Sequence, residues 1–291
     1  MHKYMTSIGL GQLTTKKQEE IVLKSIIDKP FKKRIITNVE DDETMLAELS
    51  KEYIPGIGLK VYGQYDYNEE FQIDHYFPYL EGREVSLDTE CIFQKKMDST
   101  ALSGLVEDPR VGVSLIFYMS NALDCLDNGE LKNEVAVRKI ALSALSSEGT
   151  ILMPTTNTMN VLANILKEPA PAKIVKDEGE NILPEVQYAF NDMEMTFAIN
   201  KRIQNEDLFS IIETSIIPYG MEAEVYKIVG IIAEVEKFKN RILNESVYLM
   251  KVYVNDIVMD LCINESDLQG MPEVGRRFAG VVWLQGRLVK N

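Results

Sequence analysis

The segment Val-Tyr-Leu-Met-Lys-Val-Tyr-Val-Asn-Asp-Ile-Val-Met-Asp-Leu-Cys-Ile, residues 247–263, points most directly to the fold class. Two runs rich in β-branched and aromatic residues flank the pair Asn255-Asp256, and such residues favour strands. Asn and Asp tolerate the left-handed backbone conformation that a two-residue hairpin turn needs. The segment therefore predicts two antiparallel strands joined by a tight turn.

The same strand pattern recurs along the chain. Apolar residues alternate over residues 58–65 and 71–75, on either side of a polar turn, which predicts a second hairpin. Further strands are expected over residues 85–93, 111–119, 150–153, 208–217, 225–235 and 278–288. A helix is expected over residues 14–27, where apolar residues recur with helical spacing after Thr14-Thr15. We therefore predict an α+β fold of mostly antiparallel sheets with several helices.

The composition of residues 160–200 differs from that of the flanking sequence. The run Pro169-Ala170-Pro171 is followed by a charged run at residues 176–180, and both are typical of connecting segments. We expect an N-terminal α+β lobe over residues 1–165 and a C-terminal β-rich lobe over residues 201–291. A linker or an irregular or helical connection over residues 166–200 is expected to join them.

The two expected lobes carry similar landmarks. In each half a Pro-Tyr pair, a strand followed by Asn, a Cys and a Gly occur in that order, namely Pro78-Tyr79, Asn121, Cys125 and Gly149 and then Pro218-Tyr219, Asn255, Cys262 and Gly280. This order suggests an internal duplication whose two copies pack around a pseudo-twofold axis. Because the spacing between the landmarks differs, a chance match of aromatic strands is the alternative.

Charge and hydropathy exclude several classes of protein. The 291 residues carry a formal net charge of -14, which disfavours binding to nucleic acid or to an anionic membrane. No stretch approaches the roughly 18 consecutive apolar residues of a membrane span, and the first residues do not form a secretory signal. We therefore expect a cytoplasmic protein without a nucleic-acid or membrane partner.

No sequence motif identifies a reaction. The three cysteines lie far apart with no Cys-x-x-Cys pair, so neither a disulfide framework nor a zinc site is expected. There is no Gly-x-Ser-x-Gly elbow and no phosphate-binding glycine loop. We predict no metal site and no cofactor, and whether the protein is an enzyme stays open at this stage.

Five residues are candidates for contacts between the lobes or with a ligand. His75 lies within a predicted strand on a largely apolar face, where a histidine with a structural role is the commoner case. Glu213 lies in an apolar strand, where a carboxylate is costly unless it has a partner such as Arg276 or Arg277. Trp283, the sole tryptophan, follows these arginines and can stack on a guanidinium.

Several long segments resemble a known family. They are residues 71–79 (FQIDHYFPY), 112–118 (GVSLIFY), 206–214 (EDLFSIIET), 218–222 (PYGME) and 272–286 (PEVGRRFAGVVWLQG). They resemble a family of uncharacterised bacterial proteins, a domain of unknown function, over nearly the whole chain. The resemblance implies no activity and no catalytic residue. The chain has Ala223-Glu224 where relatives tend to carry Cys-Asp, so any chemistry of that cysteine would be missing here.

Two functional hypotheses follow. The first is a non-enzymatic cytoplasmic binding or protein-interaction module, whose partner is another protein or a second copy of the chain. It accounts for a well-formed core without a nucleophile, metal or phosphate motif. The alternative is a metal-dependent hydrolase that uses carboxylates in a cleft between the lobes, because binding sites often lie at such junctions.

Overall fold

The protein is mostly β. The computed structural model describes residues 2–37, 44–96, 100–127, 135–155, 158 and 212–289, and most of them lie in strands. The helical elements in these ranges are short, namely η1 (Lys3–Ile8), α1 (Lys16–Asp28), α2 (Ala122–Asp127) and η2 (Glu265–Asp267). The predicted α+β class with several helices is therefore wrong.

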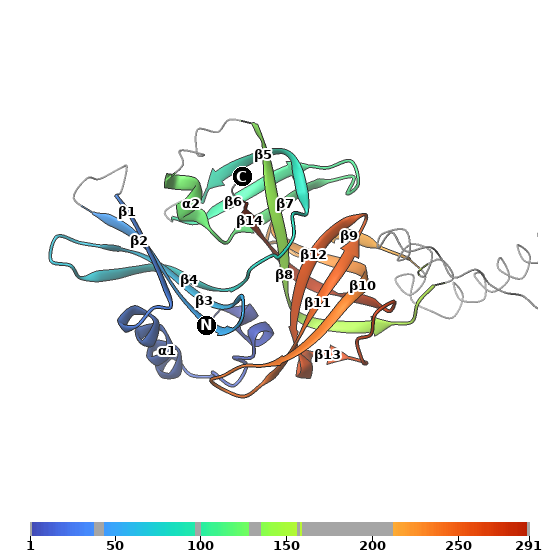
Figure 1. Ribbon diagram of the computed structural model, residues 1–291, viewed down its shortest axis with the longest axis horizontal. Coiled ribbons are helices and arrows are strands. Elements are labelled where there is room, and N and C mark those ends of the chain that lie inside the picture. Colours follow the sequence, from blue (N-terminus) through green and yellow to red (C-terminus); the bar gives the residue numbers. More distant parts are fainter. Residues whose placement is uncertain are drawn as a thin grey trace, which may run out of the picture.

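The strands form two sheets (Figure 1). The smaller sheet is an antiparallel meander of β1 (Lys32–Thr37), β2 (Met45–Ile54), β3 (Ile57–Tyr65) and β4 (Phe71–Leu80). The larger sheet contains β5 (Leu87–Lys95), β6 (Leu102–Glu107), β7 (Ser114–Met119), β8 (Ala136–Leu152), β9 (Ser215–Pro218), β10 (Val225–Lys239), β11 (Ser246–Val254), β12 (Ile257–Asn264), β13 (Leu268–Gln269) and β14 (Arg277–Leu288).

The local sequence signals are confirmed where they were strongest. The 247–263 hairpin is β11 and β12, and Asn255 and Asp256 adopt φ values of 48° and 61° in its turn. The hairpin expected around residues 66–70 is β3 and β4. The expected helix is α1, and Thr15 caps it in a reciprocal capping box with Gln18.

Most of β8 was not predicted, although it is the longest strand at 17 residues. Its sequence from Ala136 to Ser147 is rich in alanine and serine, which contribute little to strand propensity. The strand forms because β5, β12 and β14 all pair with it, and residues 140–146 are buried. Tertiary pairing therefore outweighs local propensity in this segment.

Two helices lie on opposite faces of the four-stranded sheet. On one face, Nζ of Lys51 in β2 lies 3.4 Å from the carbonyl oxygen and 3.2 Å from the hydroxyl of Ser25 in α1. On the other face, Arg34 in β1 forms ion pairs with Asp124 and Asp127 in α2. Figure 1 shows α1 and α2 on either side of this sheet, and the ends of β1–β4 project away from the rest of the molecule.

The larger sheet closes on itself twice around β8 and β14. One circuit of paired strands runs from β8 through β5, β6 and β7 to β14, which pairs with β8 again. The other runs from β8 through β12, β11 and β10 to β14. The long pair of β8 and β14 is therefore shared by two barrel-like halves (Figure 1).

The two circuits have the same connectivity. The strands divide into two sets of four, which are β5, β6, β7 and β8 in the first half of the chain and β10, β11, β12 and β14 in the second. In each set the first strand pairs antiparallel with the fourth. The third strand pairs parallel with the fourth strand of the other set, β7 with β14 and β12 with β8. Each set thus completes the circuit of the other, so the two ranges expected as lobes share one sheet.

This pairing changes the landmark comparison between the halves. By this pairing, β7 in the first set is equivalent to β12 in the second. The sequence landmarks instead match β7 with β11, the strand before Asn255. The equivalent asparagines are then Asn121 and Asn264, each followed three residues later by aspartate, Asp124 and Asp267. The connection expected over residues 166–200 lies outside the described residues.

A β-bulge interrupts β8 where it pairs with β14. Val281 pairs with Glu148 and Val282 with Ser146, so Ser147 is the extra residue. The buried Ser146 hydroxyl lies 2.8 Å from the carbonyl oxygens of both Glu148 and Val281, and it can donate to either. This hydroxyl therefore binds the backbone at the bulge.

Replacement of Ser146 by alanine tests the role of this hydroxyl. We expect Ser146→Ala to lower the free energy of unfolding by about 1–3 kcal/mol, because the buried carbonyl group of Val281 or the partly buried one of Glu148 loses its hydroxyl donor. The matched control Ser147→Ala should change it by less than about 0.5 kcal/mol. Urea unfolding measures both, and equal effects of the two substitutions would contradict the assignment.

Candidate functional site

The five candidate residues lie in two separate regions. Trp283 and His75 belong to an aromatic cluster between the two sheets. The other three lie near the start of β14. Arg277 is its first residue, Arg276 precedes it, and Glu213 follows Ile212, whose carbonyl oxygen Arg277 binds. Six residues of extended strand, about 20 Å, separate Arg277 from Trp283, so these side chains do not form one site.

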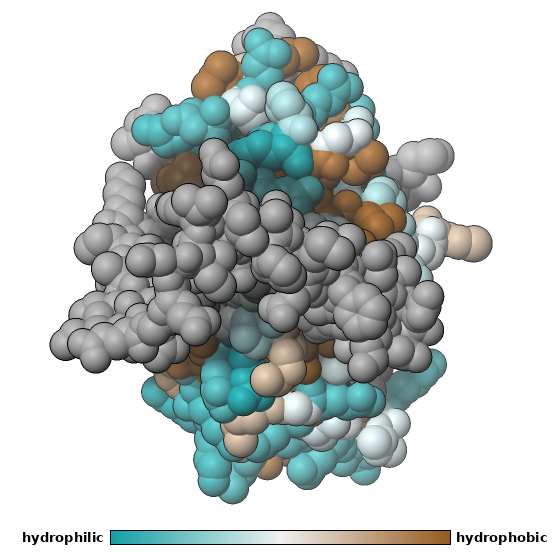
Figure 2. All heavy atoms as spheres, turned by 90° about the vertical axis from the view of Figure 1, so that its right-hand side faces the viewer, coloured by the Kyte–Doolittle hydropathy of each residue, from teal (hydrophilic) through white to brown (hydrophobic). Residues whose placement is uncertain are grey.

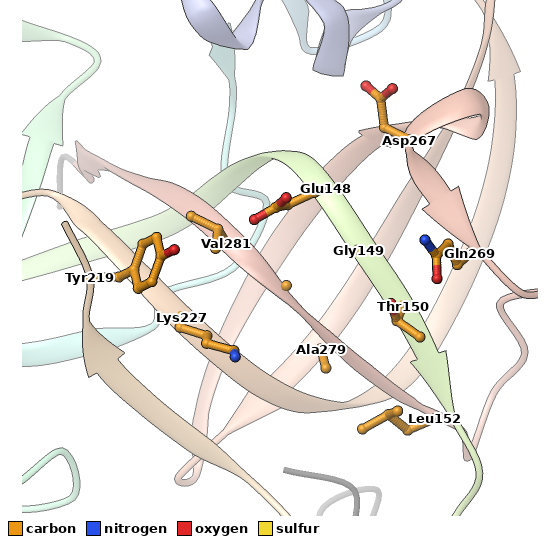
Figure 3. A pocket seen from close by; sticks show the side chains of 11 residues that line it. Glu148, Gly149, Thr150, Leu152, Tyr219, Lys227, Asp267, Gln269, Ala279 and Val281 are labelled. Atoms are coloured by element: carbon orange, nitrogen blue, oxygen red, sulfur yellow. The ribbon is translucent and has the colours of Figure 1, made fainter. Parts of the chain in front are cut away.

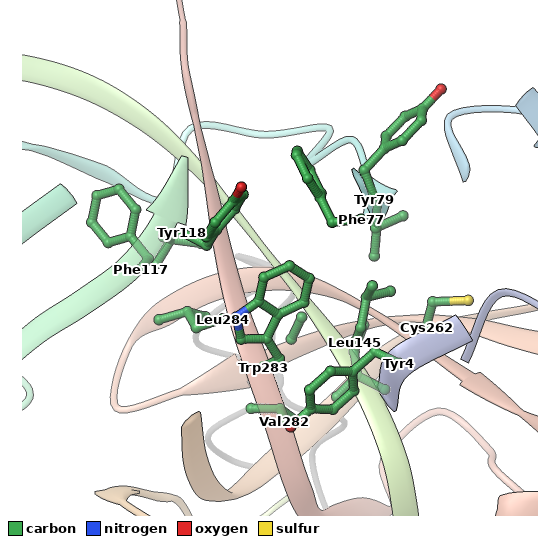
Figure 4. Packing of buried hydrophobic residues seen from close by; sticks show 14 of the residues in the cluster. Tyr4, Phe77, Tyr79, Phe117, Tyr118, Leu145, Cys262, Val282, Trp283 and Leu284 are labelled. Carbon is green, nitrogen blue, oxygen red and sulfur yellow. The ribbon is translucent and has the colours of Figure 1, made fainter. Parts of the chain in front are cut away.

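Trp283 lies at the centre of the aromatic cluster. Its ring centroid is 5.0 Å from that of Tyr118 in β7, 5.6 Å from that of Tyr4 in η1 and 6.2 Å from that of Phe77 in β4 (Figure 4). The ring centroid of His2, the residue before η1, lies 4.8 Å from that of Trp283. Offset and edge-to-face aromatic pairs of this kind stabilise packing beyond their area. Trp283 therefore joins four elements of the fold, and no arginine stacks on it among the ring contacts of the described residues.

His75 extends the same cluster toward the surface. Its ring stacks on Tyr62 at 4.9 Å and on Phe77 at 5.9 Å, and its Nδ1 lies 3.0 Å from Oδ2 of Asp74. Burial lowers the pKa of His75 below its usual value, although Asp74 opposes this shift. Burial also opposes ionisation of Asp74, but hydrogen bonds from the amide and hydroxyl of Thr100 hold its pKa below the usual value.

A buried polar group beside His75 was missed by the sequence analysis. The ammonium of Lys60 in β3 lies 2.6 Å from Oε1 of Glu48 and 2.6 Å from the carbonyl oxygen of Ser120. The Tyr62 hydroxyl donates to Oε2 of Glu48 at 2.5 Å. Burial and the Glu48 carboxylate raise the pKa of Tyr62 well above its usual value. The one sequence signal was Lys60 as the single charged residue of its strand.

A second ion pair lies on the other side of Tyr118. Nζ of Lys96 is 2.5 Å from Oε1 of Glu224 and lies 5.1 Å from the centroid of the Tyr118 ring. The buried Glu224 carboxylate also accepts a hydrogen bond from Ser103 at 2.8 Å. The carboxylates Glu48, Asp74 and Glu224 thus each bind donors from the protein. The contact of Asp74 in β4 with Thr100, between β5 and β6, links the two sheets.

The arginine region binds backbone carbonyl groups. The buried Arg277 donates from Nε and Nη2 to the carbonyl oxygen of Met153 at 3.0 and 2.9 Å, and from Nη1 to that of Ile212. Glu213 accepts a hydrogen bond from the hydroxyl of Thr155. Arg276 is more exposed and pairs with Glu273 at 2.9 Å. Arg277 therefore fixes the end of β8 to the segment that enters β9.

A shallow pocket lies on β10, β14, β8 and β13 (Figure 3). Its volume is about 350 Å³. The charged and polar lining side chains are Glu148, Thr150, Tyr219, Lys227, Asp267 and Gln269, and the floor contains Ala279 and Val281. Among the lining residues, Glu148 and Asp267 are acidic and Lys227 is basic.

A different surface lies on the projecting end of the four-stranded sheet. Cross-strand pairing places Ile35 with Ala47, Gly63 and Ile73 in one row, and Met45, Tyr65 and Phe71 in the next row on the same face. We call Ile35, Met45, Tyr65, Phe71 and Ile73 the distal face. Ile35, Met45 and Ile73 are 40%, 53% and 44% exposed. Helix α1 lies on the same side of the sheet, where Leu49 and Val61 are buried.

Within the described ranges, no three His, Cys, Asp or Glu residues lie close enough together to hold a metal ion. None of the helices in the same ranges is long and apolar enough to cross a membrane.

The fold defines a mostly β protein with two strand circuits that share a central pair and a four-stranded sheet beside them. Residues 5–286 match the family described as "Domain of unknown function, E. rectale Gene description (DUF3881)", and the chain belongs to this family. The expected resemblance to a family of unknown function is thereby confirmed. No curated protein and no solved structure matches the chain.

Replacement of Arg277 tests the structural role assigned to it. We expect Arg277→Met to lower the free energy of unfolding by about 3 kcal/mol, because the carbonyl groups of Met153 and Ile212 lose the charged donor that the buried Arg277 supplies. Arg276→Met, one residue away and more exposed, should cost less than about 1 kcal/mol. Chemical denaturation measures both, and a stable Arg277→Met protein would contradict the assignment.

The two histidines predict a dependence of stability on pH. Burial, followed by the charge of the N-terminus, lowers the pKa of His2 from 6.5 to about 4, and burial lowers that of His75. The pKa of each histidine is lower in the folded than in the unfolded protein. The folding stability linked to the neutral rings is therefore complete above pH 6.5, and it is lost as the pH falls through the folded-state pKa values.

An NMR titration of the histidine ring protons checks this directly. Both signals should titrate below pH 6.5, with His2 at the lower pH, and His2→Gln assigns them by removing one signal. A midpoint at or above that value for His75 would show that its ring is solvated rather than buried between Tyr62 and Phe77.

Proposed function

We propose that the protein is a non-enzymatic protein-interaction module of the cytoplasm that binds a partner protein through the distal face. The observation that carries this proposal is the apolar, exposed half of a sheet whose other half is covered by α1. Contiguous exposed apolar surface costs free energy in water and often marks a protein contact.

The shape of the sheet supports the same proposal. A sheet that is apolar on both faces is normally covered on both, and α2 and the larger sheet lie on the opposite face. The distal face lies on strands that project from the body, so a partner can approach it without contact with the rest of the chain (Figure 1).

Other parts of the surface differ from the distal face. At the opposite end of the molecule, described side chains of hydrophilic and hydrophobic character are intermixed (Figure 2). The distal face carries a single charged neighbour on its own side of β1, Lys33, whose ammonium lies 4.6 Å from the centroid of the Tyr65 ring.

The metal-dependent hydrolase has less support. The carboxylates nearest the junction between the sheets, Glu48 and Glu224, are bound to Lys60 and Lys96. A largely buried carboxylate that already neutralises a lysine is a poor candidate for holding a cation or activating water. No observation in the described residues favours that reaction over binding.

Site-specific photo-cross-linking in cells that express the protein tests the proposal. A photoreactive phenylalanine derivative in place of Met45 should yield a discrete adduct, because Met45 is exposed on the distal face. An adduct of twice the chain mass identifies a second copy, and any other mass identifies another protein. Ile73→Asp should abolish the adduct, because a carboxylate buried in the contact is costly.

The matched control places the same derivative at Val274, which is 56% exposed and lies outside the four-stranded sheet. Circular dichroism of Ile73→Asp establishes that the variant is folded. The proposal fails if position 45 gives no adduct, if positions 45 and 274 give the same adducts, or if Ile73→Asp leaves the adduct unchanged.

A further inference from the structure

We infer that the outer edge of β1 pairs with β1 of a second copy of the chain, antiparallel and with Ile35 opposite Ile35 of the partner subunit. The two four-stranded sheets then form one continuous sheet around a twofold axis. This inference is independent of the proposed function, because it concerns an edge of the sheet and leaves the rest of the distal face open to another protein.

β1 presents a regular edge with which no described strand pairs. It is the first strand of the meander, and Figure 1 shows it at the rim of the projecting sheet. Its six residues pair with β2 without a register shift, and none of them is buried. An unpaired edge of this kind exposes a row of backbone N–H and C=O groups that can bind another strand.

The strands β4 and β9, which also end a strand order, have blunted edges. A bulge interrupts the pairing of β4 with β3, and Pro78 in β4 has no N–H to donate. The Gln285 side chain in the larger sheet donates to the carbonyl oxygen of Pro78 and accepts from the amide of Leu80. β9 has four residues and ends at Pro218. Bulges, prolines and short length commonly protect strand edges, and β1 has none of them.

The cations of β1 do not shield its edge, although charged side chains often serve that purpose. Lys32 pairs with carboxylates on β2 and after β4, and Arg34 pairs with two carboxylates of α2, a helix that contacts both β1 and β2. Nζ of Lys33 lies over the ring of Tyr65 in β3. All three side chains therefore lie toward their own sheet or α2, and an approaching strand meets the backbone of β1.

Side-chain direction and charge select the register. Residues directly opposite in an antiparallel pair share a face of the sheet. With Ile35 at the axis, Lys33 lies opposite Thr37 of the partner subunit and Arg34 lies opposite Ile36 of the partner subunit. A centre at Arg34 would instead oppose two guanidinium groups. A centre at Ile36 would reduce the paired positions within β1 from five, residues 33–37, to three, residues 35–37.

Charge favours a second copy over an unrelated strand. In the sequence, residues 29–34 carry four cations and residues 40–43 carry four carboxylates. Antiparallel pairing brings the N-terminal end of one β1 to the C-terminal end of the other, so opposite charges approach at both ends of the pair. Of the four cations, Lys29 and Lys33 form no ion pair within the described part of the chain.

Light scattering after size-exclusion chromatography, over a series of protein concentrations, tests the inference. We expect the molar mass to rise from one chain mass toward two. Ile35→Lys should raise the Kd of the dimer about tenfold, because it removes the isoleucine pair and opposes two ammonium groups at the axis. The matched control is Ile73→Lys in the same cross-strand row. Ile73 is 44% exposed against 40% for Ile35, but it lies on β4, so this variant should dimerise as the unchanged chain does.

Engineered cysteines test the register. Ile35→Cys should form a disulfide-linked dimer under mild oxidation, because directly opposite Cβ atoms lie about 5 Å apart. Lys33→Cys and Thr37→Cys should each form little dimer alone, but a mixture of the two should link. The native cysteines Cys91, Cys125 and Cys262 are buried, and the unchanged chain gives the background.

Circular dichroism establishes that each variant is folded. The inference is overturned if the unchanged chain stays monomeric at every concentration, even where another protein pairs with β1. It is also overturned if Ile35→Lys and Ile73→Lys dimerise alike, or if Lys33→Cys links to itself as readily as to Thr37→Cys. A monomeric chain would leave the proposed contact of the distal face with another protein untouched, because that contact does not require the twofold axis.

Discussion

The pairing of β8 with β14 is the constraint on which the rest of the structure depends. It runs over twelve paired positions, from Leu152 with Arg277 to Ile140 with Leu288, and it closes both circuits of the larger sheet. Because each circuit borrows one of these strands from the other half of the chain, neither half can complete its barrel alone. Closure also leaves fewer unpaired strand edges than an open sheet of this size would have.

The shared pair explains why polar groups are buried at particular places. A strand that leaves one circuit and enters the next must bend, and the bulge at Ser147 supplies this bend. The bulge displaces carbonyl groups that Ser146 then binds, and at the end of the pair Arg277 binds those of Met153 and Ile212. From the sequence, Arg277 was a candidate because an arginine could pair with Glu213, and in the structure Arg277 is buried and donates to these carbonyl oxygens.

The sequence predicted elements whose signal is local and missed those that depend on distant partners. Asn255-Asp256 specifies its turn from two residues, and Thr15 with Gln18 specifies the start of α1. In contrast, the alanine- and serine-rich β8 is a strand because three other strands pair with it. The same limit applies to the site: Lys60 signals burial within its own strand, but its partner Glu48 lies on a neighbouring strand and Ser120 lies outside the sheet.

The division between closed and open sheets explains where binding capacity remains. In the closed circuits most backbone groups are paired and inward side chains fill the core, and the shallow pocket on β10, β14, β8 and β13 opens on the surface of these strands. The four-stranded sheet is an open meander, and α1, at 13 residues, spans about 20 Å of it. The strands extend beyond the reach of this helix, and the apolar residues there, Ile35, Met45 and Ile73, stay exposed as a direct consequence of that difference in length.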